Sequence, residues 1–313
     1  MFRRFDECIA IPLLILLGAC TMKGSQPEPL RDGLITADDG AKIYYSIVGN
    51  GPDTLLAPPA AYLALDFTPL VKGRTIVFYD PRSRGKSELL TDSTRFGFYK
   101  DVEDMEAVRR ALKIGHMSVL GWSYFGGVAA VYASAHPEHV THLIQVGPIA
   151  PRSNAAWNDS RRISRQVDTV AVRRVLAMRG AVRTAADSLT YCRLDVRYRM
   201  LPGAMADTGA IARMKSDPCA SQNENPERWR RSVRLALAQL GTSYDFRPEL
   251  ARVTAPVLVV WGDADPGPEL AVREWVSTWP KARLLVIHGA GHLPWLEHPE
   301  VFFPAVDRFL RGA

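Results

Sequence analysis

The chain has 313 residues, of which 47% are hydrophobic and 23% are charged, a composition typical of a globular protein with a substantial core. Its formal net charge is +6, and the excess of arginine is concentrated in residues 152–247. No zinc-ligand spacing and no aromatic-interleaved basic motif accompanies this charge, so we expect no metal, no cofactor and no nucleic-acid partner.

The N-terminal residues predict export. Residues 8–19 (CIAIPLLILLGA) are apolar, but a helix of this length would span only about half of a bilayer core, which indicates a signal peptide rather than an anchor. The stretch LGAC (17–20) resembles a bacterial lipobox, with Cys20 as the residue that is lipidated. We therefore predict a signal peptide over 1–19, a tether over 20–33, and a lipoprotein that faces the periplasm, with the outer membrane slightly favoured. A cleaved signal without lipid remains the alternative, and palmitate labelling that is lost in Cys20→Ser would exclude it.

From residue 34 onward, strand and helix patterns alternate. Short apolar runs predict strands, and a run from Asp101 with apolar residues at helical spacing predicts a helix. In chain order the expected strands are 42–49, 54–57, 75–80, 117–121 and 142–147, with helices from Asp101 and over 126–135. Strands that alternate with helices indicate a mostly parallel sheet that is covered on both faces.

The strand pattern stops at about Pro151 and resumes with strands over 255–263 and 282–289, each followed by a helix. The intervening residues 152–247 are arginine-rich and helical in pattern. They predict a cap inserted before the penultimate strand, with the core formed by 34–151 and 248–313. We expect the arginines of this cap to pair locally, although an anionic substrate or lipid headgroup is an alternative reason for them.

Two cysteines, Cys192 and Cys219, lie within the predicted cap. In an oxidising periplasm they could form a disulfide, and two buried free thiols are the alternative.

Ser123 stands between a strand-like and a helix-like run, in GWSYFGG (121–127). A sharp turn at this point would expose its hydroxyl and direct the N-terminus of a helix at a developing oxyanion. Serine needs a base and an orienting carboxylate to act as a nucleophile. His292 and Asp265 each follow one of the last two predicted strands, at the carboxyl ends where open α/β sheets place their sites.

These stretches resemble the α/β-hydrolase fold, in particular lidded bacterial serine hydrolases similar to prolyl iminopeptidases. The resemblance rests on FYDPRSRGKS, DVEDMEAVRRALKIG, GWSY, HPEHVTHLI, PVLVVWGDADP and GAGHLPWLEHPE, and it covers residues 34–313 apart from the cap. It implies a catalytic triad of Ser123, Asp265 and His292, with Asp263 as the alternative acid. It also implies that Asp80 and Arg82 form a structural turn. Each of the other histidines fits a loop or a helix end, so we expect them to be surface or packing residues.

The sequence departs from the family pattern in two places. Phe125 occupies the position of the second glycine in Gly-x-Ser-x-Gly, but the spacing to the Pro-Glu pair at 137 and 138 indicates a substitution rather than an insertion. Pro58 and Pro59 stand in the loop that should help to form the oxyanion hole, and proline has no N–H to donate. The donors are therefore expected to be the N–H of Tyr124 and that of Ala60 or Ala61.

We thus expect a serine hydrolase that cleaves a small ester, or an amide bond in a short peptide, through an acyl-enzyme. Esterase and aminopeptidase activity remain open, because the leaving group leaves no signature in the sequence. The alternative from another class is a catalytically silent lipoprotein that holds a ligand or partner in the same pocket.

Overall fold

The computed structural model describes residues 31–154, 168–221 and 226–312. The predicted signal peptide, Cys20 and most of the predicted tether lie outside the described residues. None of the described helices is both long and apolar enough to cross a membrane.

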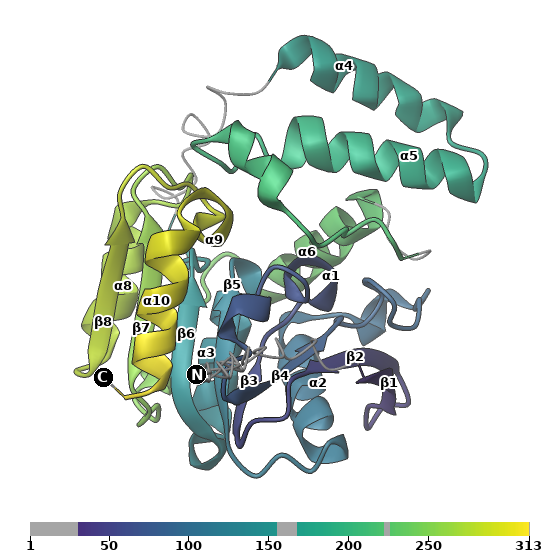
Figure 1. Ribbon diagram of the computed structural model, residues 1–313. Coiled ribbons are helices and arrows are strands. Elements are labelled where there is room, and N and C mark those ends of the chain that lie inside the picture. The colour runs from purple at the N-terminus through teal and green to yellow at the C-terminus, as the bar shows by residue number, and fades with distance from the viewer. Residues whose placement is uncertain (1–30, 155–167, 222–225, 313) are drawn as a thin grey trace, which may run out of the picture.

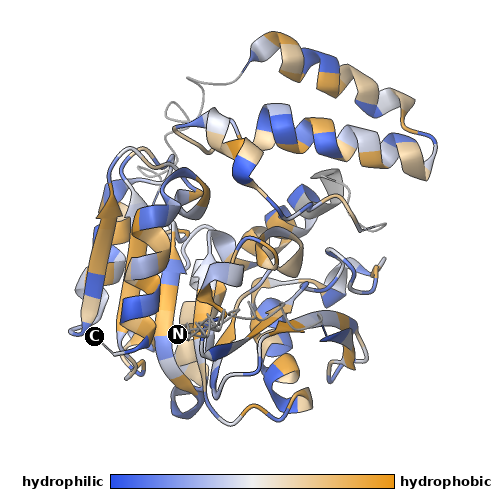
Figure 2. Cartoon of the chain, viewed as in Figure 1, coloured by the Kyte–Doolittle hydropathy of each residue, from blue (hydrophilic) through white to orange (hydrophobic). Residues whose placement is uncertain are grey.

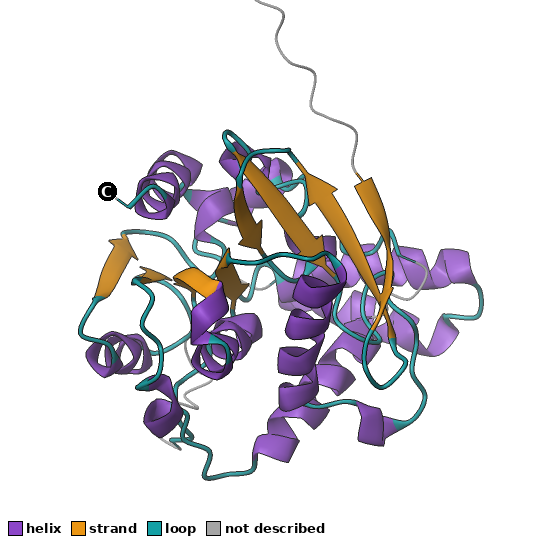
Figure 3. Cartoon of the chain, turned by 90° about the horizontal axis from the view of Figure 1, so that it is seen from below, coloured by secondary structure: helices purple, strands orange, loops and turns teal. Residues whose placement is uncertain are grey.

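Eight strands form one sheet in the order β1-β2-β4-β3-β5-β6-β7-β8 (Figures 1 and 3). The β1–β2 and β2–β4 pairs are antiparallel, and all the remaining neighbours are parallel. The mostly parallel sheet predicted from the sequence is therefore confirmed. The strands are β1 (Arg31–Thr36), β2 (Lys42–Val48), β3 (Asp53–Leu56), β4 (Arg74–Tyr79), β5 (Met117–Trp122), β6 (Val140–Val146), β7 (Val257–Gly262) and β8 (Ala282–Ile287).

The edge strand β1 was not predicted, since the first strand expected from the sequence was 42–49, which corresponds to β2. Residues 31–33, which were expected to belong to the tether, are paired with β2 in an antiparallel register. The sequence signal is weak because β1 is an edge strand with mostly exposed side chains, including Leu34 at 59% exposure. Pairing with β2, rather than burial of its own side chains, defines this strand.

Helices cover both faces of the sheet, as Figure 1 shows. Side chains of the central strands alternate between two cores: Val119 and Val259 face one, and Leu120 and Val260 face the other. The first core includes α2 (Phe98–Ala111), α3 (Tyr124–Ala135) and α8 (Glu269–Thr278), and the second includes α10 (Pro299–Leu310). Shorter helices are α1 (Ala60–Leu63), α7 (Arg247–Leu250), α9 (Pro294–Glu297), η1 (Thr68–Leu70), η2 (Ser93–Arg95) and η3 (Pro137–His139).

The chain between β6 and β7 is helical, as predicted, and forms the cap. Its described elements are α4 (Thr169–Met178), η6 (Arg179–Ala181), α5 (Ala185–Asp195), the π-helix η7 (Val196–Met200), η8 (Thr208–Arg213) and α6 (Pro226–Leu240). The two ends of this insertion meet: Arg152 and Asp245 form an isolated bridge, and Ser153 donates its N–H to the Tyr244 carbonyl at 2.8 Å. In Figure 1, α4 and α5 project from the rest of the molecule, whereas α6 lies close to the core.

A disulfide and local ion pairs hold the cap together. Cys192 on α5 is bonded to Cys219, with Cα atoms 5.8 Å apart. Asp195 is buried and receives hydrogen bonds from Arg199 and Arg230. These pairs neutralise part of the arginine excess inside the cap. In Figure 2, hydrophilic and hydrophobic residues alternate along α4 and α5.

Candidate active site

Ser123 occupies a sharp turn between β5 and α3. Its backbone has φ 57° and ψ −121°, a region that residues other than glycine rarely adopt. The turn is held in place by three hydrogen bonds: the Ser123 N–H donates to the Val146 carbonyl at 2.8 Å, and the Ser123 carbonyl accepts from Gly126 at 2.9 Å and Ile149 at 3.1 Å. Strained backbone of this kind persists where the surroundings over-determine it, and it is concentrated at functional sites.

Glycines on either side of Ser123 permit the turn. A Cβ on Gly121 would lie 2.0 Å from the Phe125 carbonyl oxygen, and a Cβ on Gly126 would lie 2.7 Å from Pro148 Cβ. Gly126, not residue 125, therefore makes the close approach to the chain that leaves β6. The Phe125 ring is buried against Tyr124 and under the Arg84 guanidinium, which lies 5.2 Å from the ring centroid, so these two side chains accommodate the bulky substitution.

His292 and Asp265 lie on the loops that follow β8 and β7. His292 Nδ1 is 2.7 Å from Asp265 Oδ2, and Asp265 is only 2% exposed. The other Asp265 oxygen accepts the Gly267 N–H at 2.6 Å, which fixes the carboxylate. Asp263, the alternative acid, instead contacts His288 Nδ1 at 2.9 Å. The structure therefore places Asp265, and not Asp263, against His292.

The environment of His292 changes its basicity. Burial by itself would lower the pKa of His292, but the negative charge and hydrogen bond of Asp265, together with the charge of Glu297, raise that pKa above its usual value of 6.5. An imidazole that is made more basic and has one nitrogen fixed by a carboxylate is suited to accept a proton at the other nitrogen.

Ser123 and His292 line the same pocket, which has a volume of about 180 Å³. The Trp122 indole N–H donates to the His292 carbonyl at 2.9 Å, which ties the histidine loop to the residue before the serine. The rest of the wall is almost entirely apolar and comes from both core and cap: Tyr62, Trp122, Tyr124, Phe125, Met200, Leu201, Ala204, Val233 and Leu293. Both residues that flank Ser123 thus line the pocket.

The loop after β3 holds the two prolines. Pro58 and Pro59 are joined by a cis peptide bond, and neither has an N–H. The Ala61 N–H donates to Asp80 Oδ1 at 2.8 Å and is therefore occupied. Within the described part of the chain, no hydrogen bond engages the backbone N–H of Ala60 or of Tyr124. Of the two alanines, only Ala60 thus retains an N–H without such a partner. Neither is among the residues that line the Ser123 pocket, and both line a neighbouring cavity beside Asp80.

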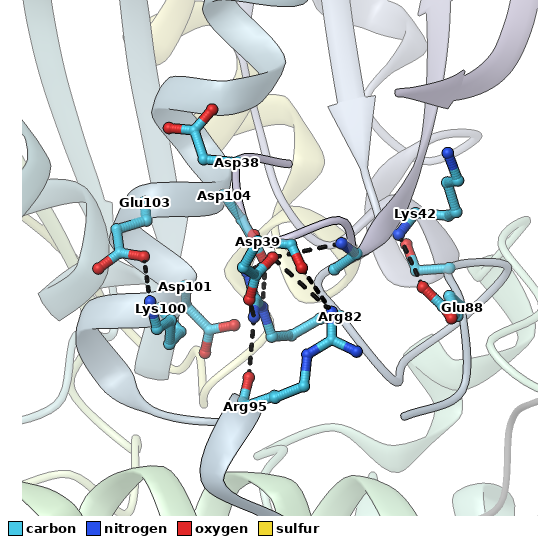
Figure 4. A network of polar contacts seen from close by, with 12 residues as sticks. Asp38, Asp39, Lys42, Arg82, Glu88, Arg95, Lys100, Asp101, Glu103 and Asp104 are labelled. Atoms are coloured by element: carbon cyan, nitrogen blue, oxygen red, sulfur yellow. Dashed lines mark hydrogen bonds and ion pairs between the residues drawn. The ribbon is translucent and has the colours of Figure 1, made fainter. Parts of the chain in front are cut away.

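The turn after β4 contacts this loop through Asp80, which accepts the Ala61 N–H. Asp80 also accepts the Lys86 N–H at 3.0 Å. Burial raises the pKa of Asp80 to about 6, against the opposing effect of these two N–H donors. Arg82 is held by Asp104, at 2.9 Å and 2.5 Å, and by Asp39 at 2.6 Å, as Figure 4 shows. Both residues are thus bonded as parts of a turn, and neither lines the Ser123 pocket.

Two residues that lie beside the His292–Asp265 pair were not singled out as site residues from the sequence. Gly147 follows β6 and has φ +49°, and a Cβ there would lie 2.7 Å from Asp265 Oδ2 and 2.8 Å from His292 Nδ1. Glu297 is buried next to the His292 loop. In the sequence, only the position of Glu297 in the stretch GAGHLPWLEHPE around His292 could have indicated a role at the site. Nothing in the sequence indicated such a role for Gly147.

Gly147→Ala should therefore lower the turnover rate strongly while the protein still folds. The methyl group would push on the His–Asp pair, and a shift of about 1 Å at such a site can lower the rate about 10²-fold. Gly40→Ala is the matched control, since Gly40 also has positive φ but a Cβ there meets nothing within 4 Å. Both variants should lose about 1–2 kcal/mol of stability from the backbone conformation, and Gly147→Ala should lose more because of the contact with the His–Asp pair; thermal unfolding would measure both losses. Equal turnover by the two variants would contradict this role for Gly147.

The sheet order, the strained serine turn and the His–Asp pair at adjacent strand ends define an α/β-hydrolase fold. A family model described as "Alpha/beta hydrolase family" matches residues 49–305, and the chain belongs to this family. Homologues in it are named as proline iminopeptidases and esterases, so the protein is an enzyme of the hydrolase class.

Similar proteins include members of both types. A "Proline iminopeptidase" of Heyndrickxia coagulans is 22% identical over 253 residues, covering 81% of this chain and 87% of that protein. A "Pimeloyl-[acyl-carrier protein] methyl ester esterase" of Aromatoleum aromaticum is 29% identical over 204 residues, covering 62% of this chain and 74% of that protein. Among solved structures, an esterase from Exiguobacterium antarcticum superposes with a TM-score of 0.61 at 19% identity, covering 89% of this chain and 98% of that chain.

Proposed function

We propose that the enzyme is a serine esterase that cleaves small carboxylic esters with an apolar acyl group. In this mechanism, His292 accepts the Ser123 hydroxyl proton while Oγ attacks the ester carbonyl carbon. The bond to the alcohol oxygen then breaks, and His292 returns the proton to the departing alcohol. A water molecule deprotonated by His292 releases the acid from Ser123. Asp265 holds the imidazole in the required tautomer throughout, and the N–H groups of Tyr124 and Ala60 are proposed to bind the oxyanion.

The apolar lining of the Ser123 pocket is the observation that favours an ester substrate over a peptide substrate. An aminopeptidase must hold the positively charged α-amino group of its substrate, and a carboxylate in the site is the natural partner for it. None of the described residues that line the pocket is an aspartate or glutamate.

The described acidic residues of the cap are also engaged elsewhere. Asp195 binds two arginines, and Asp217 pairs with Arg193 at 2.6 Å. Asp168, Asp187 and Asp207 accept backbone N–H groups at the starts of α4, α5 and η8, and Asp245 pairs with Arg247. The described cap therefore offers no acid that is positioned for an amino group, which supports an ester substrate.

A panel of two substrates tests this proposal. Purified protein should hydrolyse a short acyl ester of p-nitrophenol. It should have little or no activity on a proline arylamide, which is a test substrate for a proline aminopeptidase. Faster cleavage of the arylamide would overturn the ester preference and favour an aminopeptidase. The alternative function, a catalytically silent binding protein, would be favoured if folded protein turned over neither substrate and failed to react with a fluorophosphonate probe.

The raised pKa of His292 leads to a pH prediction. The imidazole must be neutral to accept the serine proton, and it is protonated below its pKa, so kcat/KM for the ester should fall as pH falls through a value above 6.5. Activity should be retained at pH values above that limb. Measurement of kcat/KM between about pH 5 and 9 checks this, and a profile that stays flat across the neutral range would contradict a histidine base.

A further inference from the structure

Glu297 joins two segments of the chain that are far apart in sequence. It is the last residue of α9 and is only 5% exposed. Its Oε1 accepts the N–H groups of Ala206 at 2.6 Å and Asp207 at 2.8 Å, and its Oε2 accepts the Gly291 N–H at 2.8 Å. The first two donors belong to the cap, and the third belongs to the loop that carries His292.

The two segments also touch directly. The His292 N–H donates to the Ala204 carbonyl at 2.7 Å. A Cβ on Gly291 would lie 2.5 Å from that same carbonyl oxygen, so only glycine permits this contact. The cap segment 204–207 is therefore bonded to the histidine loop at Gly291 through Glu297 and at His292 directly.

The same part of the cap forms a wall of the Ser123 pocket. Leu201 and Ala204 line that pocket together with His292. Farther along the cap, Arg213 Nη1 donates to the carbonyls of Leu296 and Glu297, at 2.9 Å and 3.1 Å, which secures the backbone of α9 against η8. Any displacement of segment 204–207 would thus move both the wall of the substrate pocket and the loop that holds the base.

We propose that Glu297 is a positioning residue that fixes the cap wall and His292 relative to each other, so that a closed pocket and a correctly placed base form together. The proposal rests on the proposed serine esterase function. Three N–H donors directed at two oxygens suit an ionised carboxylate, because a protonated acid would have to present one O–H donor to them. Glu297 does not line the pocket, so its effect on substrate is exerted through Ala204 and His292.

Glu297→Gln tests the proposal with little change of shape. The amide replaces one acceptor oxygen by a donor, which faces either Gly291 or the cap N–H groups. We expect kcat to fall roughly 10- to 100-fold and KM to rise several-fold, since a hydrogen bond to a charged group is lost and a buried N–H is left unpaired. Glu297→Asp, which retains the charge, should recover part of kcat. Glu300→Gln is the matched control: Glu300 is exposed and contacts His298 at 3.2 Å, so its kinetics should stay within about two-fold of wild type.

Kinetics within two-fold of wild type in folded Glu297→Gln would overturn the proposal. So would a loss of activity that only follows the fraction of unfolded protein at the assay temperature. Hydrogen exchange on the wild type requires no variant. The amides of Ala206, Asp207 and Gly291 should be protected, and exchange as fast as that of exposed loops would refute the proposed hydrogen bonds to Glu297. A failure of the serine esterase proposal would look different, since wild-type Ser123 would then not react with a fluorophosphonate while these amides stayed protected.

Discussion

Ser123→Ala should reduce kcat for an ester by about 10⁶-fold, the scale of loss seen when a serine nucleophile is removed from a triad. Without Oγ no acyl-enzyme can form, and the remaining groups can only assist the direct attack of water. The reaction with a fluorophosphonate probe should also disappear, because the probe bonds to the activated oxygen. Substrate binding should change little, since the walls of the pocket are contributed by larger side chains.

The control for this variant is Ser277→Ala. Ser277 is exposed on α8, and its hydroxyl donates to the Glu274 carbonyl at 2.9 Å, so that variant should keep wild-type turnover and labelling. Alanine at 123 keeps the same strained backbone as serine, so the thermal unfolding of both variants should resemble that of wild type. Probe labelling that survives in Ser123→Ala would assign the nucleophile to another residue.

Asp265→Asn should lower kcat by about 10⁴-fold, as loss of the orienting carboxylate does in a serine triad. The amide can donate to Nδ1 of His292 and so favour the wrong tautomer, and it removes the negative charge that stabilises the imidazolium. Because that charge raises the pKa of His292, the acid limb of kcat/KM should also move to lower pH in this variant.

Asp263→Asn is the comparison that separates the two candidate acids. Asp263 contacts the exposed His288 and the Gly289 N–H, so turnover should change only a few-fold, on the scale of an exposed ion pair. If Asp263→Asn had the larger effect and Asp265→Asn left the pH profile unchanged, the acid would be Asp263. Circular dichroism of both variants confirms that the comparison is made on folded protein.

The three candidate catalytic residues could be identified from the sequence because each follows a predicted strand. The short apolar runs that precede Ser123, Asp265 and His292 predict parallel strands, and parallel strands bring their carboxyl ends to one edge. The cap was also predictable, since 95 or so residues without a strand pattern cannot continue a sheet. The exposed edge strand β1 was not predictable from its pattern, because its partner supplies most of what defines it.

Sequence by itself thus determined the fold class, the place of the cap and the phrases that hold the site residues, since these depend on local periodicity and spacing. Tertiary structure decided what depends on distances between remote segments: that Asp265 rather than Asp263 reaches His292, that Cys192 meets Cys219, and that Ala61 is occupied by Asp80. Phe125 shows the difference most clearly. Whether a phenyl ring can replace a glycine depends on which residue approaches the neighbouring chain, and only the packed turn places Gly126 there.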